Sequence, residues 1–123
     1  MYATQLEAYG TAQKTTMSGR EIEAAALTKA AMKIKDCQAN WDAADRDSML
    51  YEALRMNQMV WSIFQAELAK EDNPLQKQLK QDILSLSVFI DKRIIEVLSD
   101  PSPEKLNIII EINLNIAAGL RGW

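Results

Sequence analysis

The stretch from Ser48 to Leu68, SMLYEALRMNQMVWSIFQAEL, decides the fold class of this 123-residue chain. Its apolar residues recur at intervals of three and four, the spacing that places side chains on one face of an α-helix. We therefore predict an amphipathic helix here, the strongest in the chain. The face consists of Leu50, Ala53, Leu54, Asn57, Val60, Trp61, Phe64 and Leu68.

Apolar residues at the same spacing also occur on either side of this stretch, and each such row predicts a further helix. One spans about residues 19–39, with a capping box at Ser18-Gly19-Arg20-Glu21. Two more are expected to start at Pro74 and at Ser102-Pro103, because proline is favoured at the first helical position. A shorter helix is expected over about residues 3–15. Asp42, Asp45 and Asp47 lie in a polar connection, and any one of them could cap the helix that follows.

The order of these helices predicts an all-α protein. No window shows strand-like alternation between hairpin turns, and short connections between helices are typical of an antiparallel bundle. The chain is 48% hydrophobic and 25% charged, ordinary values for a globular domain of this size. We predict a single domain over residues 1–123, an antiparallel bundle of four to five helices.

The composition argues against catalysis. The chain contains no histidine, so the commonest general base and metal ligand is missing, and Cys37 is the single cysteine. No phosphate-binding loop or metal-binding helix motif is present. We predict a protein that is not an enzyme and that needs no cofactor and no metal.

Charge and hydropathy constrain the partners. The net charge is −3, and the nearest approach to a basic patch is Lys29, Lys33 and Lys35, which argues against direct binding of nucleic acid. The N-terminus does not resemble a signal peptide, and the longest apolar stretch, 108–112, is too short to span a bilayer. We expect a cytoplasmic protein that does not bind membranes.

Two asparagines interrupt apolar rows on separate helices. Asn57 and Asn113 each lie mid-row, where an unpaired amide would cost about 1–3 kcal/mol. We expect them to hydrogen-bond to each other or to free backbone groups and so to fix the register of the bundle. The alternative is that one of them meets a partner. Asn57, Trp61, Phe64 and Asn113 are assigned to the core.

Several helices carry apolar residues outside their main row, which a helix that only covers a core does not need. Extra apolar faces indicate central burial, self-association or a surface for another helix, and methionines suit adaptable binding surfaces. We expect at least one binding groove. The extra residues are Met49, Met56, Met59, Ile63, Leu84, Val88, Ile95, Ile108 and Ile112.

Segments along nearly the whole chain resemble the FlaF family of flagellin-biosynthesis regulators of alphaproteobacteria. The resemblance depends on the order and spacing of short pieces, each weak alone. They are Ala8-Tyr9-Gly10 with Gln13, Arg20-Glu21-Ile22-Glu23-Ala24 with Ala26-Leu27, Leu54-Arg55-Met56-Asn57-Gln58, Trp61-Ser62-Ile63-Phe64-Gln65, Asn73-Pro74-Leu75, Leu84-Ser85-Leu86-Ser87 with Phe89-Ile90-Asp91, and Ile112-Asn113 with Asn115-Ile116-Ala117-Ala118-Gly119-Leu120-Arg121-Gly122.

The resemblance implies a helical regulator that promotes flagellin synthesis and filament assembly. It implies flagellin as the partner, in a chaperone-like role, and action opposite FlbT, a translational repressor of flagellin that is a second possible partner. Flagellin ends in amphipathic segments that stay disordered until assembly, and such segments need an apolar groove. The family has no established catalytic residues to carry over.

The predicted contacts lie on the Ser48 helix and the last helix, flanking the main rows. Two alternatives stay open: a regulator that contacts flagellin messenger RNA directly, and a bundle that self-associates, with a homodimer as its form. The candidate partner-binding residues are Arg55, Gln58, Met59, Gln65, Leu114 and Asn115.

Overall fold

The computed structural model describes residues 19–122, and this part of the chain forms four α-helices without a strand. The helices are α2 (Gly19–Ala39), α3 (Arg46–Leu68), α4 (Lys77–Ser99) and α5 (Asn107–Gly122), with a 3-10 turn, η1 (Pro103–Leu106), before α5. The predicted all-α class is confirmed. The helix expected over residues 3–15 and the cap at Ser18 lie outside the described residues.

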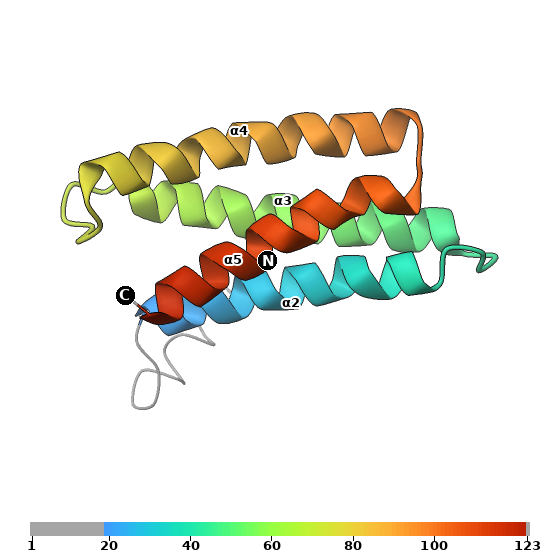
Figure 1. Cartoon of the computed structure of the whole chain (residues 1–123), viewed down its shortest axis with the longest axis horizontal. Coiled ribbons are helices and arrows are strands. Elements are labelled where there is room, and N and C mark those ends of the chain that lie inside the picture. Colours follow the sequence, from blue (N-terminus) through green and yellow to red (C-terminus); the bar gives the residue numbers. More distant parts are fainter. Residues whose placement is uncertain (1–18, 123) are drawn as a thin grey trace.

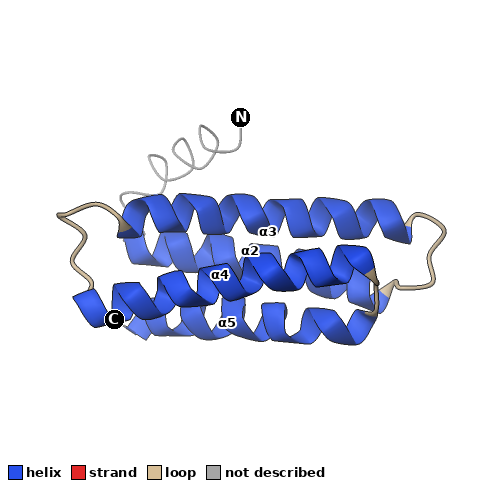
Figure 2. Ribbon diagram, turned by 90° about the horizontal axis from the view of Figure 1, so that it is seen from above, coloured by secondary structure: helices blue, strands red, loops and turns tan. Residues whose placement is uncertain are grey.

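Successive helices run in opposite directions and form an antiparallel bundle (Figure 1). α3 and α5 lie on opposite sides of α4 when the bundle is seen from above, with α2 beneath (Figure 2). α2 packs most extensively against α5 and α3, whereas α4 packs chiefly against α3 and has smaller contacts with α5 and η1. Of the four described helices, α4 therefore has the least protein around it.

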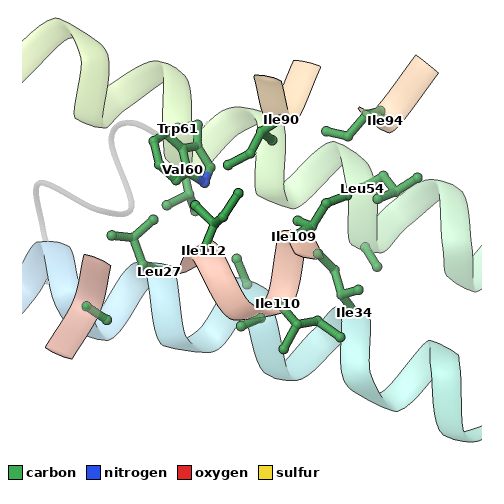
Figure 3. Packing of buried hydrophobic residues seen from close by; sticks show 14 of the residues in the cluster. Leu27, Ile34, Leu54, Val60, Trp61, Ile90, Ile94, Ile109, Ile110 and Ile112 are labelled. Carbon is green, nitrogen blue, oxygen red and sulfur yellow. The ribbon is translucent and has the colours of Figure 1, made fainter. Parts of the chain in front are cut away.

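The buried residues of the helices differ in size. Small residues allow two helix axes to approach closely, and α2 and α5, which pack most extensively on each other, both carry fully buried alanines. α4 instead buries isoleucines and a valine, and Figure 3 shows two of them, Ile90 and Ile94, in the same cluster as Trp61 and the α5 isoleucines. The alanines are Ala24, Ala30, Ala31 and Ala117, and the α4 residues are Ile83, Ile90, Ile94 and Val97.

The connection between α3 and α4 differs from the prediction. Pro74 was expected at the first helical position, but α4 begins at Lys77. The cause is Asn73, whose Oδ1 accepts a hydrogen bond from the amide of Leu75 at 3.1 Å and whose Nδ2 donates to the carbonyl of Glu67 at 3.1 Å. The side chain thus forms a local turn that delays the helix.

The aspartates before α3 also act differently from the prediction. Asp45 occupies the N-cap position, but its side chain makes no capping hydrogen bond. Asp47 lies in the first turn, where a negative charge is favourable, and its carboxylate pairs with Arg46 at 2.8 Å. Arg46 also stacks over Trp41, 4.3 Å from the ring centroid, and this contact fixes the α2–α3 connection.

Hydrogen bonds between residues far apart in sequence hold both ends of α5 against α2. Gln38 of α2 donates to the carbonyl of Pro103 at 2.8 Å and to Oδ1 of Asn107 at 2.7 Å. At the other end, Arg121 donates to the hydroxyl of Thr28 at 3.1 Å. Ser102-Pro103 opens η1, which leads directly into α5, so the predicted proline start is confirmed here.

Candidate functional site

A buried polar network joins three helices at the centre of the bundle. Nδ2 of Asn113 donates to Oδ1 of Asn57 at 2.6 Å, which confirms the predicted pairing of the two asparagines. Asn113 also donates to the carbonyl of Leu27 at 3.2 Å and accepts from Nε1 of Trp61 at 2.9 Å. Asn57, Trp61, Phe64 and Asn113 are all buried, so their side chains stabilise the bundle rather than a contact at its surface.

A small hollow of about 20 Å³ lies between α2 and α3 and contains two carboxyl groups. Burial, and secondly the charge of Glu67, raise the pKa of Glu23 to about 7, while Arg20 opposes the shift. Glu67 pairs with Lys70 at 2.9 Å. The hollow is too small to hold a substrate, so we interpret Glu23 as a source of pH-dependent stability. The remaining lining is Ala26, Leu27, Val60, Ile63 and Phe64.

A larger hollow of about 350 Å³ lies farther along the same two helices and is open to solvent. Its lysines, Lys29 and Lys33, share the lining with Asp36 and Glu52, so the charges are mixed and no basic patch results. Met32 and Met49 complete the wall, and no aromatic side chain is available for stacking on a base.

The largest group of exposed apolar residues lies on α4. Leu84, Val88, Ile95 and Leu98 are spaced by four, seven and three residues, and Asp91 occupies the position that completes the alternation of four and three. This is the seam spacing of a helix that pairs with another helix. We call these five residues the α4 seam. The exposed fractions are 38% for Leu84, 54% for Val88, 64% for Ile95 and 48% for Leu98.

The α4 seam is separate from the row that α4 buries. The buried row consists of Ile83, Ser87, Ile90, Ile94 and Val97, each one residue before a seam position. Adjacent residues on a helix are about 100° apart, so the seam points well away from the core. α4 therefore has a second apolar face without a partner among the described residues.

The surplus apolar surface predicted from the sequence exists, but mainly on one helix. Leu84, Val88 and Ile95 are exposed, as a binding surface requires. Of the other predicted residues, Ile112 is buried, and the remainder are half-buried. The sequence reasoning missed Leu98 and Phe89, both exposed. Leu98 could have been predicted, because it continues the alternation of four and three residues that starts at Leu84.

The predicted partner-binding residues lie on two sides of the bundle. Arg55 and Gln58 are exposed on α3, with Met59 and Gln65 half-buried on the same helix. Leu114 is half-buried and Asn115 exposed, both on α5, across the bundle from α3 (Figure 2). One partner helix cannot contact both sets at once.

Two other kinds of site are absent from residues 19–122. No group of three or more potential ligand side chains is arranged to hold a metal ion there. None of the helices in this range combines the length and apolarity that crossing a bilayer requires. Cys37 is buried and unpaired, and burial raises the pKa of its thiol, which disfavours the reactive thiolate.

Comparison with known proteins gives the family. The family model described as "Flagellar protein FlaF" matches residues 5–120. The chain belongs to the FlaF family. No curated protein and no solved structure matches it. The range that matches FlaF includes the central polar network and the α4 seam, so both lie in the part of the chain that carries the family relationship.

Proposed function

We propose that this FlaF-family protein regulates flagellum biogenesis by binding flagellin before export. In this role it acts as a chaperone for flagellin, promotes flagellin synthesis and filament assembly, and opposes the repressor FlbT. The observation that supports binding is the α4 seam. α4 already packs on the core through its separate buried row, so packing within the bundle does not account for the apolar residues of the seam.

The physical reason is the cost of exposed apolar surface. Removing apolar surface from water is worth about 25 cal/mol per Å², so four large aliphatic side chains in one row favour association. An amphipathic segment that is disordered until it assembles has the complementary face, and its apolar side chains also need cover. Docking of such a segment on α4 satisfies both surfaces.

The structure gives less support to direct binding of messenger RNA. RNA-binding surfaces combine clustered basic residues with exposed aromatic side chains. The lysines of α2 lie instead beside Asp36 and Glu52, and the exposed rings Tyr51 and Phe89 lie on other helices. We therefore favour a protein partner.

The test is size-exclusion chromatography with light scattering, on the protein alone, on monomeric flagellin, and on a mixture at micromolar concentration. We expect a new species with the mass of a complex, free of RNA. Unchanged elution of both proteins would refute the proposal. Binding of flagellin messenger RNA that weakens steeply with salt, without flagellin binding, would favour the alternative.

A further inference from the structure

We propose that the α4 seam binds an amphipathic helix that carries a lysine or arginine in the middle of its apolar row, and that Asp91 selects this partner. The inference depends on the proposed function for the identity of the natural partner, flagellin. It adds the docking surface, the position of the partner helix and the residue that determines specificity.

Asp91 is unusual because a carboxylate occupies the centre of an apolar row. It lies seven residues after Leu84 and seven before Leu98, and it is exposed. Its carboxylate makes no hydrogen bond or ion pair with any side chain of residues 19–122. A helix that covers the seam must therefore bury this charge, which is costly unless the partner supplies an opposite charge.

The same residue argues against a second copy as the occupant. Asp91 lies midway between the two ends of the seam, so two copies that overlap fully about a two-fold axis would bring the two Asp91 carboxylates together. Like charges in contact oppose association. A different helix with a basic residue fits the surface better.

The neighbouring face of α3 supplies a polar border. Met49, Glu52, Ile63 and Glu67 face α2, since they line the two hollows between these helices. Tyr51, Gln58 and Gln65 follow a seven-residue repeat on the opposite flank of the buried row and therefore face α4.

The α4 seam lies on the α3 side of α4. Seen from the N-terminal end of α4, α3 lies to the left, as Figures 1 and 2 agree. A right-handed helix turns clockwise as it leaves the viewer, so the residue after each buried position points to the left and outward. A helix on the seam would thus meet Tyr51, Gln58 and Gln65 along one edge, and two of these were predicted from the sequence as partner contacts.

The first experiment tests the chemistry of the seam without flagellin. Two 18-residue peptides, with leucine and isoleucine at the seam positions of a heptad and either lysine or glutamate at the central one, are titrated into the full-length protein by calorimetry. We expect the lysine peptide to bind at least about tenfold more tightly, because only it neutralises Asp91. Equal affinities, or no binding of either peptide, would overturn the inference.

The second experiment uses monomeric flagellin and three variants. Asp91→Lys reverses the charge in the seam, and Glu111→Lys makes the same change on the exposed face of α5. We expect Asp91→Lys to weaken flagellin binding by about 30-fold or more and Glu111→Lys to leave it within about twofold. Asp91→Leu removes the like-charge repulsion, so we expect this variant to self-associate at concentrations where the unmodified protein is monomeric.

The outcomes separate the two proposals. If the lysine peptide is preferred but flagellin does not bind, the seam is confirmed and flagellin is the wrong partner. If flagellin binds and Asp91→Lys behaves as Glu111→Lys does, the proposed function stands and the seam is not the docking site. Monomeric Asp91→Leu would contradict the role of Asp91 in preventing self-association.

Discussion

Replacing Asn113 by leucine tests how the buried network stabilises the bundle. The substitution leaves the Trp61 N–H and Oδ1 of Asn57 without the partners they have at 2.9 and 2.6 Å. Each buried group left unpaired costs about 1–3 kcal/mol, so we expect Asn113→Leu to lower the free energy of unfolding by about 2–6 kcal/mol. Leu27 is less affected, because its carbonyl lies inside a helix and also accepts a backbone hydrogen bond.

Asn57→Leu is the matched control. Nδ2 of Asn57 has no hydrogen-bond partner, so its removal relieves an unpaired group, and Asn113 keeps its bonds to Leu27 and Trp61. We expect Asn57→Leu to cost about 1 kcal/mol. The double variant leaves only the Trp61 N–H unpaired and should be more stable than Asn113→Leu alone. Urea unfolding followed by circular dichroism measures all three. Equal losses from the two single variants, or simple additivity, would refute this reasoning.

Three further predictions concern packing, titration and the seam. Ala117 is fully buried on α5, so Ala117→Leu should lower the free energy of unfolding by about 1–3 kcal/mol or more, because the core has no room for the added side chain. Ala118 is exposed on the same helix, and Ala118→Leu should change the free energy of unfolding little in the same urea titration. The pKa of Glu23 is raised from 4.5 to about 7, so the folded state binds more protons than the unfolded state between these values. The contribution of Glu23 to the free energy of unfolding should be fully present below about pH 4.5 and should be lost as the pH rises through 7. Glu23→Gln should remove this decline and raise the free energy of unfolding by about 1–2 kcal/mol at pH 8, less than the roughly 3 kcal/mol equivalent to the shift because the carboxyl group is partly solvated; an unchanged pH profile would refute the prediction. Ile95→Ser, on the exposed seam, should change the free energy of unfolding by no more than about 0.5 kcal/mol, and a loss of several kcal/mol on thermal or urea unfolding would mean that the seam is part of the core.

The sequence predicted the features that depend on helical periodicity. The rows of α2, α3, α4 and α5 were recognisable because each helix buries one face, and the mid-row positions of Asn57 and Asn113 indicated that the two side chains would pair. Family resemblance added what periodicity cannot provide, membership of the FlaF family and the hypothesis that flagellin is the partner.

The features missed from the sequence depend on local turns and on three-dimensional neighbours. The start of α4 was placed at Pro74, because the competing hydrogen bonds of Asn73 could not be deduced from a propensity for proline. The candidate partner contacts on α3 and α5 remain predictions, and the sequence did not reveal that, among residues 19–122, the largest exposed apolar row lies on α4. Which helix is left uncovered depends on how closely the others pack. Here α2 packs most extensively on α5 and α3, whereas α4 has smaller contacts with its neighbours, and periodicity along one helix does not reveal this difference.

Hydrogen exchange with mass spectrometry, on the protein alone and with excess monomeric flagellin, tests the central claim most directly. We expect flagellin to slow exchange in peptides that cover residues 84–98 and, more weakly, in those that cover Tyr51 to Gln65, with α2 unchanged. Protection confined to α2 and α5, or no protection anywhere, would contradict the claim that α4 presents the binding surface.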